Sequence, residues 1–422
     1  MFAYGGADVE RVVLHVDANS FYASVEVLYH PELRGRAVSV CGDPEERHGI
    51  VLASTREAKR RGVKTGMAIW QARQVCPELI CLKPHYDLYI HFSKLIRAVE
   101  EGWTDRIEAF GLDENWLELT ERGMTMARGA RIADQIRLRV REELGITVSV
   151  GVSFNKILAK LGSDMKKPDA VTVLDAESWR GKVWPLPAAD LLYVGPATRR
   201  RLMRLGIFTI GDLAAAPPET LVRAIGKNGL MLKAFACGLD DSPVRRVGVE
   251  AQIKSVGNSA TAPRDVRTAE EARCMCYLLA ESVGARLREG GFRCGQVTLS
   301  ARTAELEISS HQLLLPRPVN STGEIGAAAC RLFRERFSES LPLRSLGLSC
   351  GRLVPKQAPM QVELFGEERR ARVEALDTAL DELRRRFGHR VAERGVVLAD
   401  GAFAAVNPKE EHLIHPVGFL GG

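Results

Sequence analysis

The sequence predicts a multidomain α/β protein. The chain has 422 residues, more than one ordinary hydrophobic core accommodates. Its first part alternates short runs rich in β-branched residues with longer amphipathic runs, and the same alternation returns in residues 253–354. The stretch between them, which begins near Pro185 and Pro187, carries only helical patterns. We therefore expect two α/β regions separated by a small helical region.

The elements of the first region follow in order. Residues 11–18, "RVVLHVDA", predict a strand, and "SFYASVEVLY" after it predicts a helix, so Asp17 stands where a strand ends. Residues 50–67 predict a short strand and a basic helix that ends at Gly62. Residues 107–112 and 116–120 predict a hairpin around Asp113 and Glu114.

A long helix is expected next, with apolar residues four apart on one face and Gly145 as its end. Residues 146–153, "ITVSVGVS", predict a buried strand, and "NKILAKLGSDMKK" predicts a helix closed by Pro168. We expect these elements to form one sheet with its helices on one side.

The remaining elements are helical first and mixed afterwards. "LLYVGPATRRRLMRLGIFTIGDLAAAP" predicts two short helices split by a glycine turn. Residues 253–354 include a long helix at about 271–289 and the strand "CGQVTLSAR". After Pro355 the apolar residues of the last helix recur at three-four spacing; they are Val373, Leu376, Leu380, Leu383 and Phe387.

Composition narrows the class of protein. Hydrophobic residues make up 45% of the chain and charged residues 27%, as in soluble globular proteins. No run of about 18 apolar residues occurs, and "MFAYGGADVE" does not resemble a signal peptide, so we expect no membrane contact and a cytoplasmic location. Nine cysteines without a CxxC pair disfavour a disulfide framework or a zinc site. The net charge of +6 is a weak indication of a polyanionic partner.

Three acids stand at predicted strand ends or turns: Asp17, Asp113 and Glu114. Mg²⁺ prefers oxygen ligands and is often bound by a few carboxylates together with substrate phosphates. Two such ions, roughly 3.5 to 4 Å apart, activate an attacking hydroxyl and stabilise a leaving pyrophosphate. On spacing alone, a polar hairpin turn without a metal is the favoured explanation of Asp113 and Glu114.

Three stretches resemble the palm motifs of Y-family DNA polymerases, the translesion group that includes bacterial DNA polymerase IV; they are "LHVDANSFYASVE", "GLDENWLELT" and "SVGVSFNKILAKLGSDMKKPDAV". They occur in the family's order and at its separations. The resemblance implies a right-hand polymerase that adds dNTPs to a primer 3′-hydroxyl, with low fidelity and no proofreading. It implies an α/β palm at 1–45 and 78–180, small fingers at 46–77, a helical thumb at 181–243, an α/β little finger at 251–355 and a tail at 356–422.

The same resemblance implies roles for site residues. Asp17 and Asp113 would bridge two Mg²⁺ ions, Glu114 would bind the catalytic ion, and the Ala18 carbonyl would complete the other. Tyr22 matches the steric gate that excludes a 2′-hydroxyl, with an ordinary core tyrosine as the alternative.

The nucleotide-binding residues implied by the resemblance are Phe21, Tyr22, Arg56, Lys59 and Lys167. Phe21 is expected to lie in the core beside the gate. Lys167 would reach the nucleotide phosphates, whereas Lys166 is expected to be solvated. Arg56 and Lys59 lie three apart on a predicted helix, which suits a phosphate clamp.

The chain departs from the commoner family pattern at several positions. The clamp carries Ala53, Arg56 and Lys59 where a threonine, a tyrosine and an arginine are usual, so its detailed contacts stay open. Further departures are Asn19, Gly111, Asn115 and Trp116. None of them removes a metal ligand.

Two further motifs concern partners. "VGPATRRRLMRLGI" resembles a helix–hairpin–helix that binds a DNA phosphate, through Gly195, Ala197 and Arg199, although a plain helical hairpin is the alternative. "QVELF" fits a peptide that binds the sliding clamp through Gln361, Leu364 and Phe365, with a local contact to the next helix as the alternative. The expected partners are primer–template DNA, dNTP and the sliding clamp, and we expect a monomer.

Two competing functions remain. A non-catalytic DNA and clamp adaptor with this fold would be favoured by loss of the three acids, all of which are present. A cyclase or primase with a similar palm would leave Tyr22, the helical hairpin and "QVELF" unexplained.

Overall fold

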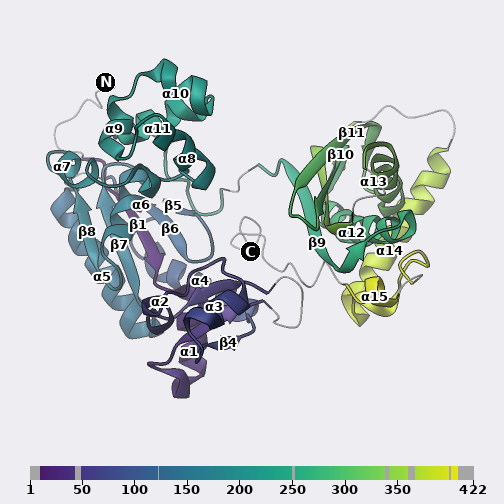
Figure 1. Cartoon of the computed structure of the whole chain (residues 1–422), viewed down its shortest axis with the longest axis horizontal. Helices are drawn as coiled ribbons and strands as arrows, with labels where there is room; N and C mark the ends of the chain where they lie inside the picture. Colours follow the sequence, from purple (N-terminus) through teal and green to yellow (C-terminus); the bar gives the residue numbers. More distant parts are fainter. Residues whose placement is uncertain are drawn as a thin grey trace. The chain divides into compact units, whose positions relative to one another are not determined.

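The computed structural model describes residues 10–42, 49–121, 123–249, 252–337, 342–359, 366–398 and 401–406. These residues form two compact units, one before Glu250 and one after Ala251 (Figure 1). Both units combine sheets and helices, so the predicted α/β multidomain class is confirmed. Among the described helices, none has the length and apolar character needed to cross a membrane.

A five-stranded sheet lies at the centre of the first unit. Its strands have the order β5-β6-β1-β7-β8, with β1 buried along its whole length. β1 pairs antiparallel with β6 and β7, while β7 and β8 are parallel. The bounds are β1 Val13–Ala18, β5 Ile107–Ala109, β6 Glu114–Glu118, β7 Val148–Ser153 and β8 Val171–Leu174.

Helices cover both faces of this sheet, so the expectation of one covered side is wrong. A Cβ atom added to Gly129, in α5 (Met126–Leu144), would lie 2.5 Å from Cγ1 of Val12 and 3.5 Å from Cγ1 of Val152. A Cβ atom added to Gly151 would meet α6 (Lys156–Met165) instead. Neighbouring strand residues face opposite sides, so α5 and α6 lie on opposite faces. An apolar stripe predicts that a helix packs on the sheet, but it does not predict which face of the sheet the helix covers.

Two glycines let α6 approach β7 closely. At Gly151 an added Cβ would lie 1.9 Å from the Ala159 carbonyl oxygen and 2.5 Å from the Ser163 nitrogen. At Gly162, in α6, it would lie 3.2 Å from the Cα of Gly151. Only residues without side chains fit this contact, and it sets the distance between α6 and the end of β1.

A second, three-stranded sheet of order β3-β2-β4 belongs to the same unit. The basic helix α2, which follows β3, ends at Arg60. Gly62, the predicted end of this helix, has a φ of 96°, a conformation that suits glycine after a helix. The bounds are α1 Phe21–Tyr29, η1 Pro31–Leu33, β2 Val38–Cys41, β3 Val51–Ser54, α2 Arg56–Arg60, α3 Ile69–Val75, β4 Ile80–Leu82 and α4 Tyr86–Glu101.

The helical region shares a hydrophobic core with α6, through Leu158 and Leu161. The two short helices predicted around a glycine turn are α8 (Pro196–Arg204) and α9 (Ile210–Ala215), and Gly206 between them has a φ of 75°. The other elements are α7 Trp179–Val183, η2 Ala188–Asp190, α10 Pro218–Ile225 and α11 Asn228–Ala236.

The second unit contains an antiparallel sheet of order β11-β10-β12-β9 that shares one core with α12 and α13. The predicted long helix is α12, Ala269–Glu289, and the predicted strand lies within β10, Phe292–Thr303. The other elements are β9 Ser255–Val266, β11 Ile308–Val319, α13 Thr322–Arg336, β12 Leu343–Pro355, α14 Glu367–Phe387, η3 His389–Val391 and α15 Gly401–Ala404.

The last predicted helix, α14, exists but does not bury the apolar face that its spacing suggests. Leu376 and Phe387 are 56% and 68% exposed, whereas Asp377 is 2% exposed. The inward face is held by charged contacts, including Arg394 to Asp377 at 2.6 Å and Arg288 to Asp381 at 2.6 Å. Ion pairs therefore set the orientation of this helix. The predicted clamp residues Gln361, Leu364 and Phe365 lie outside the described residues.

Candidate active site

Two of the predicted acids face each other across paired strands. Asp17 is the penultimate residue of β1, and the β1–β6 register places it opposite Glu114, the first residue of β6. Strand β6 thus begins at Glu114, two residues before the predicted start at Trp116. The Ala18 N–H donates to the Asp113 carbonyl oxygen at 2.9 Å, which fixes the end of β1 against the bend before β6. Asp113 lies in that bend, so the strict alternation of side chains does not apply to the pair.

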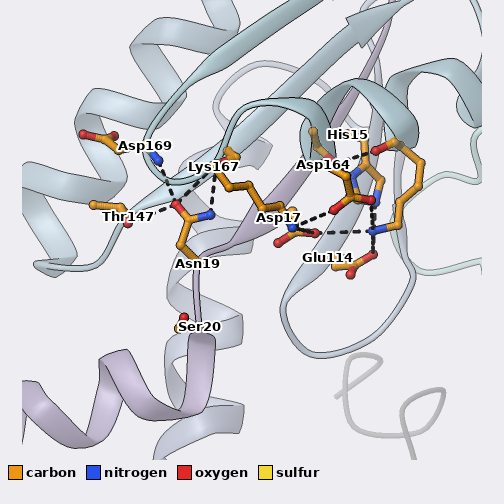
Figure 2. Close-up of polar contacts among 12 residues, drawn as sticks. His15, Asp17, Asn19, Ser20, Glu114, Thr147, Asp164, Lys167 and Asp169 are labelled. Atoms are coloured by element: carbon orange, nitrogen blue, oxygen red, sulfur yellow. Dashed lines mark hydrogen bonds and ion pairs between the residues drawn. The ribbon is translucent and has the colours of Figure 1, made fainter. Parts of the chain in front are cut away.

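A histidine joins this acidic pair. Ligand atoms of His15, Asp17 and Glu114 all lie within 4.8 Å of one another (Figure 2). His15 is fully buried, its Nε2 lies 3.3 Å from Glu114 Oε2, and its Nδ1 lies 2.9 Å from Ser163 Oγ. Trp116 packs edge-on against its ring at 5.2 Å. The sequence interpretation missed His15, although a residue two positions before Asp17 on a strand must share its face.

Asp113 belongs to the same electrostatic site. Its Oδ1 lies 3.3 Å from the position that a Cβ of Gly111 would take, and Gly111 has a φ of 152°. A glycine therefore leaves room for the carboxyl group and permits this backbone conformation. Burial, followed by the charges of Glu114 and Asp17, raises the pKa of Asp113 to about 6.

Two lysines neutralise these carboxylates. The Lys160 Nζ lies 2.8 Å from Glu114 Oε2 and 3.3 Å from Asp17 Oδ2. The Lys167 Nζ lies 2.8 Å from Asp17 Oδ2 and 2.7 Å from Asp164 Oδ1. Burial alone would lower the pKa of Lys160, but Glu114 outweighs it and raises that pKa. The sequence interpretation missed Lys160, because its place one helical turn before Asp164 predicts only an ion pair within the helix.

The carboxylates respond differently to this environment. Burial would raise the pKa of Glu114, but contacts with His15 and Lys160 outweigh it and lower the value to about 2. For Asp17, burial is the largest influence and raises the pKa, opposed by the charge of Lys167. Burial lowers the pKa of His15. Glu114 is thus the acid that is most firmly held in its ionised form.

Asn19 organises the chain around Lys167. Its Oδ1 accepts hydrogen bonds from Thr147 Oγ1 at 3.0 Å and from the Asp169 N–H at 2.9 Å, and its Nδ2 donates to Ser149 Oγ at 2.9 Å (Figure 2). Arg137 donates to the carboxylate of Asp169 at 2.6 Å. The segment after α6 is therefore fixed to the ends of β1 and β7. These bonds join residues distant in sequence, and the sequence interpretation recorded Asn19 only as a departure.

Tyr22 stands on an aromatic support. Its ring stacks on Tyr89 with centroids 4.2 Å apart and an interplanar angle of 12°. Tyr89 is buried and donates its hydroxyl hydrogen to Glu26. Burial, then the charge of Asp113, raises the pKa of Tyr22 to about 12, so the ring lies within electrostatic reach of the acids. Phe21 is 3% exposed and lies in the core, as predicted.

The predicted phosphate-clamp residues lie on α2. Arg56 is its first residue and is exposed, and Lys59 follows three residues later. Lys59 donates to Ser20 Oγ at 2.8 Å, beside the end of β1. Burial, then the charge of Lys167, lowers the pKa of Lys59. The structure therefore brings Lys59 toward Lys167, and leaves Arg56 at the exposed start of the helix.

The predicted DNA-contact residues lie in the helical region. Gly195 is the N-cap of α8, and Ala197 and Arg199 lie in the first turns of that helix. They are separate from the carboxylate cluster.

The donor set of the cluster fits Mg²⁺. Asp17, Asp113 and Glu114 supply carboxylate oxygens at adjoining strand ends, and hard divalent cations bind through oxygen. The lysines that contact Asp17 and Glu114 show that the site attracts cations.

Comparison with known proteins points to one family. Residues 16–164 match the impB/mucB/samB family, and residues 253–364 match the impB/mucB/samB family C-terminal domain. The chain is 47% identical over 393 residues to a protein named DNA polymerase IV from Acetivibrio thermocellus, across 93% of this chain and 98% of that protein. It is 37% identical over 389 residues to DNA polymerase IV 1 of Bacillus subtilis, across 92% of this chain and 93% of that protein.

Solved structures agree with these sequence matches. A Y-family DNA polymerase chimera of Dbh and Dpo4 superposes with a TM-score of 0.72 and 25% identity, covering 82% of this chain and 99% of that chain. An insertion ternary complex of Dbh DNA polymerase superposes with a TM-score of 0.57 and 25% identity, with the same coverage.

Proposed function

Because the chain belongs to the impB/mucB/samB family, we propose that it performs translesion synthesis with low fidelity by a two-metal mechanism. The chain is a DNA-directed DNA polymerase of the Y family. The observation that carries the mechanistic proposal is the register of β1 and β6, which sets Asp17 opposite Glu114 with Asp113 beside them.

In this proposal Asp17, Asp113 and Glu114 would hold the two Mg²⁺ ions through their carboxylates, and the Ala18 carbonyl would complete the set of ligands. When bound, such ions activate the primer 3′-hydroxyl and stabilise the leaving pyrophosphate. His15 and Lys160 both contact Oε2 of Glu114, so they orient this carboxylate before substrate arrives.

Lys167, Lys59 and Arg56 bind the nucleotide triphosphate, because α2 and the segment after α6 present cations near the same strand end. Tyr22 excludes ribonucleotides, held by its stack on Tyr89. Phe21 supports the gate from the core.

The proposed domain roles follow the predicted boundaries except at the fingers, because the three-stranded sheet includes β2 and β4 from segments predicted as palm. The five-stranded sheet is the palm, the three-stranded sheet with α2 and α3 the fingers, α8 to α11 the thumb, and β9 to β12 with α12 and α13 the little finger. Gly195 and Ala197 contact a DNA phosphate through backbone N–H groups at the start of α8. Arg199, whose N–H donates to the Gly195 carbonyl oxygen at 2.9 Å, contributes its side chain.

We propose that Gln361, Leu364 and Phe365 bind the sliding clamp and that the protein acts as a cytoplasmic monomer. Replacing Leu364 and Phe365 by alanine should remove clamp-stimulated synthesis only. A matching loss of unstimulated synthesis would support the local contact to α14 instead.

The central test is primer extension on undamaged template with Mg²⁺. Asp113→Ala should lower single-nucleotide incorporation by at least about a thousandfold, because it removes a shared metal ligand. Its affinity for primer–template DNA should stay within about twofold of wild type. Robust extension by Asp113→Ala would refute the two-metal assignment. A wild-type protein that binds DNA and clamp without extending primers would establish the adaptor alternative.

A further inference from the structure

Two ammonium groups contact the same oxygen of a proposed metal ligand. Asp17 Oδ2 lies 2.8 Å from the Lys167 Nζ and 3.3 Å from the Lys160 Nζ. The Asp17 side chain is only 7% exposed, so few directions of approach to this oxygen remain. A divalent cation that binds through Oδ2 therefore competes with the lysines for one atom.

The two lysines differ in how firmly they are held. Lys160 lies within α6, its side chain is 13% exposed, and it also contacts Glu114 at 2.8 Å. The Lys167 side chain is 35% exposed, and its second partner, Asp164, is 44% exposed. Lys160 retains contacts with both acids, so Lys167 is the lysine that can leave Asp17 without leaving that carboxylate unpaired.

The backbone beside Lys167 is fixed by contacts that do not involve the Lys167 side chain. The Asp169 N–H donates to Asn19 Oδ1 at 2.9 Å, and Arg137 and Arg141 donate to the Asp169 carboxylate at 2.6 and 3.1 Å. Exchange of partners at the Lys167 ammonium group is therefore a side-chain movement that leaves β1 and α6 in place.

The surroundings favour such an exchange when a polyanion binds. Burial and then the charge of Lys167 lower the pKa of Lys59, so the two cations disfavour each other's charge. Lys59 is tied to Ser20 at the end of β1 by a 2.8 Å hydrogen bond. A triphosphate placed between the two cations would relieve this repulsion and attract Lys167 away from Asp17.

We propose that Lys167 links nucleotide binding to metal binding by exchanging between Asp17 and the triphosphate. The inference rests on the proposed function, because it takes Asp17 as a metal ligand and Lys167 as a phosphate ligand. While Lys167 contacts Asp17, it lowers the affinity for a divalent cation. When the triphosphate engages Lys167, Asp17 Oδ2 is released to the metal. By linkage, the metal and the nucleotide strengthen each other's binding by the same factor.

The test measures Mn²⁺ binding to the full-length protein by electron paramagnetic resonance, without nucleotide or DNA. Lys167→Met removes the competing charge at similar volume and should raise Mn²⁺ affinity about three- to fivefold, the effect expected of a partly exposed ion pair. The same variant should weaken dNTP binding to the complex with primer–template DNA, measured with Ca²⁺ so that no turnover occurs. Higher affinity for Mn²⁺ together with lower affinity for dNTP is the result expected if Lys167 exchanges between Asp17 and the triphosphate.

Matched variants separate competition from other effects. Lys166→Met alters the exposed neighbour and should leave Mn²⁺ affinity unchanged. Lys167→Arg retains the charge and should stay near wild type. Unchanged or weaker Mn²⁺ binding by Lys167→Met would overturn the inference, as would an equal gain in Lys167→Arg. Unaltered Mn²⁺ binding by Asp113→Ala would instead refute the metal site itself, so the two failures are distinguishable. Thermal unfolding of each variant checks that it is folded.

Discussion

The contact between Gly151 and α6 gives the sharpest structural prediction. In Gly151→Ala the new Cβ would lie 1.9 Å from the Ala159 carbonyl oxygen, where ordinary contact begins at 3.4 Å, so α6 must retreat by about 1.5 Å. Lys160 lies in the displaced helix and would move relative to Asp17 and Glu114. Overpacking should cost about 1 to 3 kcal/mol of unfolding free energy. A shift of this size at an active site should lower the incorporation rate roughly a hundredfold.

Denaturant unfolding and single-turnover incorporation of one dNTP measure the two effects of Gly151→Ala. Gly181→Ala is the matched control, because no described atom beyond its chain neighbours and its own helix backbone lies within 4 Å of its Cβ position in α7. That control should raise stability by up to about 1 kcal/mol and leave incorporation unchanged. Wild-type stability and incorporation in Gly151→Ala would refute the close-packing account of the site.

Two further predictions concern the gate and a buried acid. Tyr22→Ala removes the ring stacked on Tyr89. It should raise ribonucleotide incorporation, relative to dNTP incorporation, by on the order of ten- to a hundredfold. Unchanged sugar selectivity in competition assays would show that Tyr22 is not the steric gate. Glu100 is fully buried in α4, and burial raises its pKa from 4.5 to about 8. Between about pH 4.5 and pH 8, Glu100 keeps a proton in the folded state that the unfolded state has released. The free energy of unfolding therefore falls as pH rises, by at most about 1.4 kcal/mol per pH unit. It levels off above about pH 8. Glu100→Gln should flatten this dependence in urea unfolding from pH 5.5 to 8.5, and a variant with the wild-type slope would contradict the assignment.

Much of the site follows from local rules applied to the sequence. Asp17 stands near the end of a strand, as the pattern of residues 11–18 predicts, whereas β6 begins at Glu114, two residues before its predicted start. Gly145 ends α5 with a φ of 71°, as its position indicates. These features depend on a few neighbouring residues. His15 was also within reach, because strand spacing places it on the face of Asp17, whereas helix spacing relates Lys160 only to Asp164.

Other features depend on contacts that spacing does not encode. Asn19 meets Thr147 and Asp169, which are distant along the chain, so its role emerges only from the folded sheet. The helices α5 and α6 lie on opposite faces of the sheet because Gly129 in α5 and Gly151 in β7 permit close contact on different faces. On α14, Arg394 and its partners override the apolar spacing. In each case a tertiary contact outweighs the local pattern.

The most direct test of the central claim is anomalous scattering from crystals grown with Mn²⁺, primer–template DNA and a nonhydrolysable dNTP. Two-metal binding predicts two Mn²⁺ peaks about 3.5 to 4 Å apart, bounded by Asp17, Asp113 and Glu114. A complex with primer and nucleotide in place but one peak or none at these carboxylates would contradict it.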